Sequence, residues 1–179
     1  MKVDNRLRGV KNSGAICGLI FSLLVSGQAL ANCELEEGYE LPRGINFDEG
    51  CKFTEGLAVL FDSNSMWGAI NRKGQVIIPF DYDSVSAFEK NFSIVTKNNK
   101  DGVINKFNKI IIPIDYQYID SYNDKFLKAR KGDKYGVINF KNETVVPFRY
   151  DNVDLFHEEL AMVIKAGYAG YVNLIVSLL

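Results

Sequence analysis

The sequence predicts an all-β protein built as a tandem array of 34-residue repeats, preceded by an N-terminal signal helix. Three observations predict this fold class. Glycine recurs every 34 residues, at Gly68, Gly102, Gly136 and Gly170. Short β-branched runs such as Val76–Ile78 have the length of strands, not of helices. Each repeat also contains a proline and a glycine, which would break the helices of a helical array with this period.

Further columns of the repeat keep the same spacing, and they combine turn-forming, rigid and aromatic residue types. Because many columns stay in register, the repeat is a property of the whole region and not a chance match. The columns are Asn71, Asn105, Asn139 and Asn173; Pro79, Pro113 and Pro147; Tyr82, Tyr116 and Tyr150; and Phe88, Tyr122 and Phe156.

Each unit is expected to be a meander of three short strands. Asn98-Asn99 and Gly132-Asp133 lie between apolar runs, where hairpin turns are needed. Gly74 and its equivalents Asn108 and Asn142 are expected to take the left-handed conformation of a second loop. The periodic proline is expected to end the third strand, so that Pro79–Asp83 connects to the next unit. The aromatic columns are expected to be buried rungs between stacked units.

These columns resemble the WG-repeat family of bacterial proteins, over about Phe53 to Asn173. The Trp of the Trp-Gly pair is replaced by Asp101, Tyr135 and Ala169 in the later units. The resemblance implies a β-rich repeat array, often outside the cytoplasm, that binds a partner and lacks a common catalytic motif. The segments that carry it in the first repeat are Leu57–Val59, Trp67–Asn71, Lys73-Gly74, Val76–Pro79 and Tyr82-Asp83.

The two ends of the array are irregular. Phe47-Asp48 and Phe53 resemble the back half of a repeat, and the C-terminal part resembles only the front half of a fourth. Two complementary halves would allow a closed, propeller-like ring. We favour an open, solenoid-like array whose ends are caps, because terminal repeats are commonly irregular. The sequence alone leaves open whether Leu174–Val176 is a natural cap or the product of a truncated reading frame. The repeat domain is accordingly assigned to residues 53–179, with three repeats and a partial fourth.

Residues 1–31 have the order of a secretory signal peptide. Basic residues precede the apolar run Ala15–Val25, and Ala29-Leu30-Ala31 provides small residues for cleavage after Ala31. The apolar run is shorter than the ~20 residues of a membrane-spanning helix, which makes an uncut anchor the weaker alternative. A lipoprotein anchored at Cys33 is disfavoured by Asn32. We therefore expect a periplasmic or secreted protein that does not span the membrane after cleavage.

Residues 32–52 are expected to form an N-terminal leader that caps the first repeat. Cys33 and Cys51 remain after removal of Cys17, and in an oxidising compartment a disulfide is favoured over two free thiols. The bond would close a loop of 18 residues and contribute roughly 3 kcal/mol by restricting the unfolded chain.

The charge of the chain argues against nucleic acid and anionic lipid as partners. The formal net charge is −1, and removing residues 1–31, which carry four basic residues and Asp4, changes it to −4. Binding to phosphates or to anionic lipids depends on clustered Lys and Arg.

Candidate catalytic and binding residues are few. His157 is the only histidine, and it lies beside Glu158 and Glu159 in an expected turn. The aspartates of the connectors, such as Asp83 and Asp151, do not keep the columns of a calcium loop and are expected to accept backbone hydrogen bonds in turns. Trp67 has no tryptophan equivalent in the other repeats and, if exposed, is the candidate contact residue for a partner; the favoured alternative is a core residue of the first repeat. No metal and no cofactor are expected.

The sequence therefore predicts a monomeric, exported β-repeat module that binds a protein or an envelope or cell-wall component and is not an enzyme. The alternative is a carboxylate-dependent hydrolase of cell wall or polysaccharide, which requires two facing acidic residues roughly 5–10 Å apart. A repeat protein without a ligand is the third hypothesis.

Overall fold

The computed structural model describes residues 33–46, 51–121, 125–154 and 160–173, and these residues form strands, turns and loops without any helix. The expected signal peptide, Phe47-Asp48, Tyr122, Phe156-His157 and the C-terminal segment 174–179 lie outside the described residues. The strands form four antiparallel sheets that follow one another along the chain. Each sheet corresponds to one repeat, and we call the sheets units 1 to 4.

Each unit is a meander whose long strands are preceded by one or two short ones. Unit 1 contains β1 (Ile45–Asn46), β2 (Phe53–Thr54), β3 (Leu57–Asp62), β4 (Trp67–Asn71) and β5 (Val76–Tyr82). Unit 2 contains β6 (Ser84–Val85), β7 (Phe92–Lys97), β8 (Lys100–Asn105) and β9 (Ile110–Tyr116). Unit 3 contains β10 (Tyr118–Ser121), β11 (Phe126–Lys131), β12 (Lys134–Asn139) and β13 (Thr144–Tyr150). Unit 4 contains β14 (Asn152–Asp154), β15 (Leu160–Lys165) and β16 (Tyr168–Asn173).

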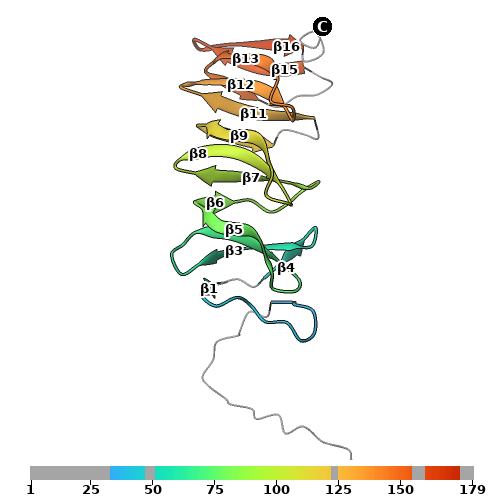
Figure 1. Cartoon of the computed structure of the whole chain (residues 1–179). Coiled ribbons are helices and arrows are strands. Elements are labelled where there is room, and N and C mark those ends of the chain that lie inside the picture. The colour runs from blue at the N-terminus through green and yellow to red at the C-terminus, as the bar shows by residue number, and fades with distance from the viewer. Residues whose placement is uncertain (1–32, 47–50, 122–124, 155–159, 174–179) are drawn as a thin grey trace, which may run out of the picture.

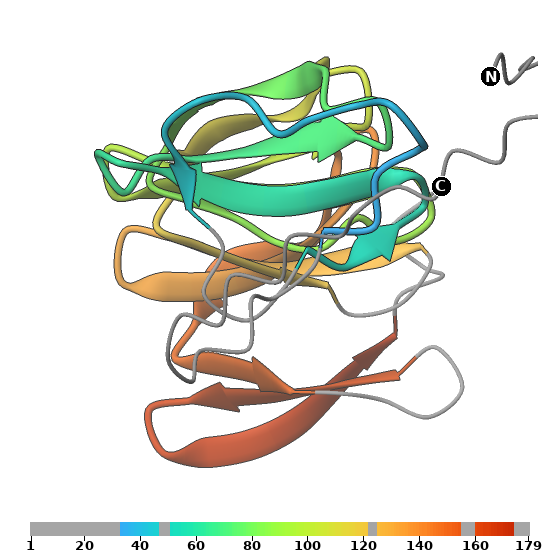
Figure 2. The same ribbon diagram turned by 90° about the horizontal axis from the view of Figure 1, so that it is seen from below.

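The units stack into an open array. Figure 1 shows the four sheets one above the other, with unit 1 and unit 4 at opposite ends. Figure 2 looks along the stack from below and shows unit 4 (red) displaced to one side of unit 1 (teal), so the array curves without closing. The predicted fold class, an open all-β array, is confirmed, and the alternative of a closed ring is not what the structure shows.

The apolar core of the array lies between the units. One buried cluster joins Leu57 and Ile78 of unit 1 to Phe88 and Ile104 of unit 2. Equivalent clusters join unit 2 to unit 3 and unit 3 to unit 4. Each sheet therefore buries its apolar side chains against the neighbouring sheet, which is how repeat arrays are stabilised.

The expected role of the periodic proline was wrong. The third strand does not end at Pro79, because β5 continues through it to Tyr82. Trp67 pairs with Tyr82 and Ala69 with Ile78, so Gly68 alone faces the three residues Pro79–Asp81 in a β-bulge. A bulged residue on an edge strand does not need to donate a backbone N–H. Proline, which has no N–H, is therefore tolerated there. The same bulges place Pro113 opposite Gly102 and Pro147 opposite Gly136.

The glycine column provides the residue of the middle strand that faces each bulge. A Cβ atom on Gly68 would lie 2.6 Å from the carbonyl oxygen of Ile78. On Gly102 it would lie 2.8 Å from the carbonyl oxygen of Ile112, and on Gly136 2.5 Å from that of Val146. These distances are too short for real Cβ atoms, so the bulged strand can cross the sheet closely only over glycine.

The asparagine column organises the loop before the third strand. The Oδ1 atom of Asn71 accepts hydrogen bonds from the backbone N–H groups of Lys73 at 2.9 Å and Gln75 at 3.0 Å. Asn105 and Asn139 make the same pair of bonds in units 2 and 3. As predicted, the left-handed position is taken by Gly74, Asn108 and Asn142, with φ values of 68°, 59° and 64°.

The tyrosine column joins one unit to the next. Tyr82 is only 5% exposed, and its hydroxyl donates a hydrogen bond of 2.9 Å to Oδ1 of Asn108 in unit 2. Tyr116 donates in the same way to Asn142 in unit 3, at 2.7 Å. Burial is the main reason why the pKa values of both tyrosines lie above the ordinary 10.0. The predicted buried rungs are confirmed for Tyr82, Tyr116, Tyr150 and Phe88.

A second joint follows directly after each tyrosine. The carboxylate of Asp151 accepts a hydrogen bond of 2.6 Å from the N–H of Ala166, in the β15–β16 turn of the next unit. Asp83 accepts from Asn99 in the same column, and the Gln117 side chain accepts from Gly132. The turn role expected for these aspartates is confirmed, and Gln117 performs it without a charge.

The leader covers the free side of unit 1. A disulfide joins Cys33 to Cys51, as predicted. Leu35, Leu41 and Ile45 pack against the buried residues Leu60 and Ile70. The N–H of Glu36 also donates to the carbonyl of Arg72 at 2.8 Å. The leader thus occupies the face of unit 1 that has no preceding unit.

The bulge geometry predicts that equivalent glycines differ in their tolerance of a methyl group. We expect Gly102→Ala to lower the free energy of unfolding by more than about 2 kcal/mol, because the third strand must move away. Gly170→Ala is the matched control, and we expect it to change stability by less than about 0.5 kcal/mol, since no described atom lies within 4 Å of its added Cβ. Urea unfolding of both variants checks this, and equal losses would contradict the proposed role of the column.

The joint at Asp151 predicts a specific pH dependence. The hydrogen bond from Lys134, followed by that from Ala166, holds the pKa of Asp151 below the ordinary 3.8. Because the folded pKa is depressed, the contribution of this carboxylate to stability is present above 3.8 and is lost as the pH falls through the folded value. We expect Asp151→Asn to be less stable at neutral pH and to lose less stability on acidification below 3.8. Urea midpoints measured across this range give the difference, and parallel curves for the two proteins would refute it.

Candidate functional site

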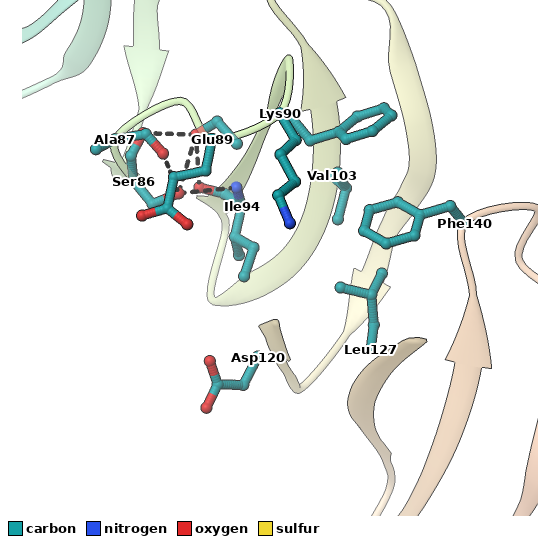
Figure 3. Close-up of a pocket in the computed structure, with 11 residues that line it drawn as sticks. Ser86, Ala87, Glu89, Lys90, Ile94, Val103, Asp120, Leu127 and Phe140 are labelled. Carbon is teal, nitrogen blue, oxygen red and sulfur yellow. Dashed lines mark hydrogen bonds between the residues drawn. The ribbon is translucent and has the colours of Figure 1, made fainter. Parts of the chain in front are cut away.

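A pocket of 330 Å³ lies between unit 2 and unit 3. Figure 3 shows its lining, which comes from both units. The residues of unit 2 that line it are Ser86, Ala87, Glu89, Lys90, Phe92, Ser93, Ile94 and Val103, and those of unit 3 are Asp120, Leu127 and Phe140.

The pocket is associated with a small residue at a position that is larger in the next unit. Ser93 in β7 is 2% exposed, and the equivalent residue 34 positions later is Leu127. The hydroxyl of Ser93 donates a hydrogen bond of 2.7 Å to the carbonyl of Ser86, and Oγ of Ser86 accepts one of 2.9 Å from the N–H of Ile94. These bonds satisfy the buried hydroxyl of Ser93.

One side of the pocket is apolar. The rings of Phe92 and Phe140 pack with their centroids 4.9 Å apart. Val103 and Leu127, each 1% exposed, complete a surface that we call the apolar wall. Such a wall favours an apolar or aromatic group of a ligand.

The opposite side is polar and charged. Glu89 and Asp120 contribute carboxylates, and Figure 3 shows the Lys90 amine directed between them and the apolar wall. Asp120 also accepts a hydrogen bond of 3.1 Å from the hydroxyl of Tyr118. Burial, followed by this bond, raises the pKa of Tyr118 above the ordinary 10.0.

The backbone that carries Lys90 is unusual. Lys90 and Asn91 have φ values of 51° and 68° and form the tight turn between Glu89 and Phe92. Few lysines adopt a positive φ, and such strained residues are concentrated at functional sites. The carboxylate of Glu55 in unit 1 accepts a hydrogen bond of 2.7 Å from the N–H of Asn91 and so fixes this turn.

Trp67, the contact residue predicted from the sequence, lies in unit 1 and does not line the pocket. Its ring is partly buried, 5.3 Å from that of Phe61, and it packs against the cluster between units 1 and 2. Its equivalent Asp101 accepts a hydrogen bond from the N–H of Ile119 in unit 3 at 2.9 Å. Asp101 thus contacts the next unit, and Trp67 packs against a cluster that includes residues of the next unit. A binding role for Trp67 stays a prediction.

The sequence predicts no metal site and, after cleavage, no membrane-spanning segment, and both stay predictions. Within the described ranges, no group of three or more His, Cys, Asp or Glu side chains is placed to hold a metal ion. In the same part of the chain there is no helix long and apolar enough to cross a bilayer. His157 lies outside these residues.

The sequence reasoning missed Ser93, Glu89 and Lys90. The signal for Ser93 was available, because a polar residue stands in a β-strand where the next repeat has leucine. Lys90 gave no signal, since a Lys-Asn pair is not a typical sequence for a turn with two positive φ values.

The fold and the repeating joints define the chain as an open β-repeat protein. The family model described as "WG containing repeat" matches residues 67–100, 102–135 and 135–168. These matches cover more than half of the sequence, and the chain belongs to the WG-containing-repeat family.

Several solved structures are similar to this chain at low sequence identity. The computationally designed Ika4 protein is 14% identical with a TM-score of 0.44, over 83% of this chain and 99% of that one. The designed Ika8 protein is 12% identical with a TM-score of 0.40, over 69% and 45%. Hsv2 of Kluyveromyces lactis is 9% identical with a TM-score of 0.36, over 62% and 39%. The chain therefore spans less than half the length of Ika8 and of Hsv2. No curated protein matches it.

The packing of Trp67 predicts that its aromatic ring stabilises the joint between units 1 and 2. We expect Trp67→Ala to lower the free energy of unfolding by about 2 kcal/mol, somewhat less than for a fully buried aromatic residue. Trp67→Tyr is expected to cost less than about 1 kcal/mol, because Tyr135 occupies the same column in unit 3. Urea unfolding measures both, and a Trp67→Ala variant as stable as the wild type would show that the ring does not contribute to packing.

Proposed function

We propose that this chain is an exported interaction module that binds a partner through the pocket between units 2 and 3. The single observation that carries the proposal is the pocket itself, in which an apolar wall faces a charged rim. Membership of a β-repeat family supports an interaction role, and the order of basic, apolar and small residues in segment 1–31 supports export.

The lining indicates the chemistry of the bound group. The phenyl rings of Phe92 and Phe140 suit the apolar part of a side chain. The rim carries two carboxylates, Glu89 and Asp120, and one amine, Lys90, so its formal charge is −1. A partner group with an apolar stem and a cationic or hydrogen-bond-donating end satisfies both sides of the pocket.

The carboxylate-dependent hydrolase is the second candidate function. The observation that favours it is that Glu89 and Asp120 line the same pocket. A hydrolase of cell wall or polysaccharide would use one of them to protonate the leaving group and the other as base or nucleophile. Release of soluble sugar fragments by the wild-type protein, abolished in Glu89→Gln, would establish this function in place of simple binding.

Affinity capture tests the interaction module. The oxidised protein is immobilised, exposed to an envelope extract of its source, and the retained proteins and glycans are identified by mass spectrometry. We expect a partner to be retained by the wild type and lost with Ser93→Leu, since the substitution enlarges a residue that lines the pocket and removes its hydrogen bond to Ser86, another lining residue.

The matched control is Ser63→Leu, which makes the same substitution at an exposed loop position of unit 1. It should retain the partner, and circular dichroism should show that all variants are folded. Loss of the partner with Trp67→Ala, but not with Ser93→Leu, would move the site to unit 1. Retention of nothing above an unrelated β protein would contradict the proposal.

A further inference from the structure

Within the described part of the chain, β16 has one strand neighbour fewer than its equivalents β4, β8 and β12. β4, β8 and β12 each pair with a strand on both sides. Among the described residues, β16 pairs only with β15 and therefore lies at the edge of its sheet. The exposed edge of a strand presents unpaired N–H and C=O groups and is a template for a further strand.

At Gly170, no described residue occupies the place that the third strand takes in the earlier units. Cβ atoms on Gly68, Gly102 and Gly136 would collide with the third strand of their units, whereas no described atom lies within 4 Å of that position on Gly170. The next residue shows the same difference. Tyr171 is 73% exposed, whereas its equivalents Val103 and Val137 are 1% and 0% exposed. In the described part of unit 4, no strand occupies the place that the third strand fills in the earlier units.

The first three units show which sequence fills the groove. The third strands are Val76–Tyr82, Ile110–Tyr116 and Thr144–Tyr150. In each of them a buried β-branched residue lies opposite the middle strand of the unit (Ile78, Ile112 and Val146). A proline in the bulge comes next, and the strand ends with a buried tyrosine. The common pattern is a β-branched residue, proline, two further residues and tyrosine.

We propose that the edge of β16 at Ala169–Tyr171 binds an extended segment of another polypeptide that carries this pattern. The segment adds to unit 4 as an antiparallel strand. Its β-branched residue lies opposite Tyr171 and its tyrosine lies opposite Ala169, as Ile112 and Tyr116 lie opposite Val103 and Asp101 in unit 2. The carbonyl of the β-branched residue lies over Gly170, and the proline occupies the bulge.

The interface continues three strand pairs already present in the chain, namely β4 with β5, β8 with β9 and β12 with β13. A second copy of this chain does not supply the segment, because β5, β9 and β13 are paired in their own sheets. The main-chain bonds give affinity in this mode of recognition, and the side chains at alternate positions give specificity. This site lies at the C-terminal end of the array and is independent of the pocket between units 2 and 3.

The test uses the full chain with its disulfide intact and a labelled synthetic peptide with the sequence of residues 143–151, blocked at both ends. We expect saturable binding in fluorescence anisotropy. Gly170→Val places a branched side chain where the peptide must cross, so affinity should fall at least ten-fold. Ser84→Val adds a branched side chain at an exposed strand position of unit 2, away from β16, and should leave affinity within two-fold of the wild type.

A variant of the peptide keeps the test independent of the folding of the protein. The peptide with Val146→Asp should lose binding to the wild-type chain, because this position is 1% exposed in unit 3. Absence of saturable binding to the wild type would overturn the proposal. So would equal affinity of the wild type and Gly170→Val, or binding of a scrambled peptide as tight as that of the original.

Discussion

The bulge in the third strand of each unit is the constraint on which the array depends. Three residues of that strand, beginning with proline, face a single glycine of the middle strand. The bulge lets the strand continue past the proline, and the strand ends with the tyrosine that contacts the next unit. A backbone that crosses this closely excludes any side chain at the facing position, and the 34-residue spacing of glycine and proline follows from this exclusion.

The apolar core of the array lies between the units. Three buried clusters each join two consecutive sheets, and a fourth joins unit 1 to the leader. The two ends of such an array need separate solutions. At the first end the leader, tied by the Cys33–Cys51 disulfide, takes the place of a preceding unit. At the other end the described part of unit 4 leaves Tyr171 and the edge of β16 exposed. The pocket lies at the joint between units 2 and 3.

The features that recur with the 34-residue period were predictable from the sequence. The glycine, asparagine and tyrosine columns indicated a β-repeat array, the irregular end repeats favoured an open one, and the residues Gly74, Asn108 and Asn142 indicated left-handed turns. The role of Pro79 was not predictable from its position alone, because a proline ends a regular strand but is accommodated in a bulge, and the bulge is visible only from the register of β4 with β5. The pocket was missed because it depends on contacts between two units, and Lys90 because its φ value is imposed by the turn and by Glu55. Trp67 was singled out for its rarity, whereas the structure shows it packed at a joint.

Amide hydrogen exchange tests most directly the claim that units 1 to 3 are closed by a bulged third strand and that unit 4 is open. The comparison is between the equivalent strands β8, β12 and β16 in the full chain. The account predicts that amides in β8 and β12 are protected to the level of global unfolding, whereas those in β16 that face away from β15 exchange much faster. Equal protection of the three strands would contradict it, because β16 would then be covered by a strand as the others are.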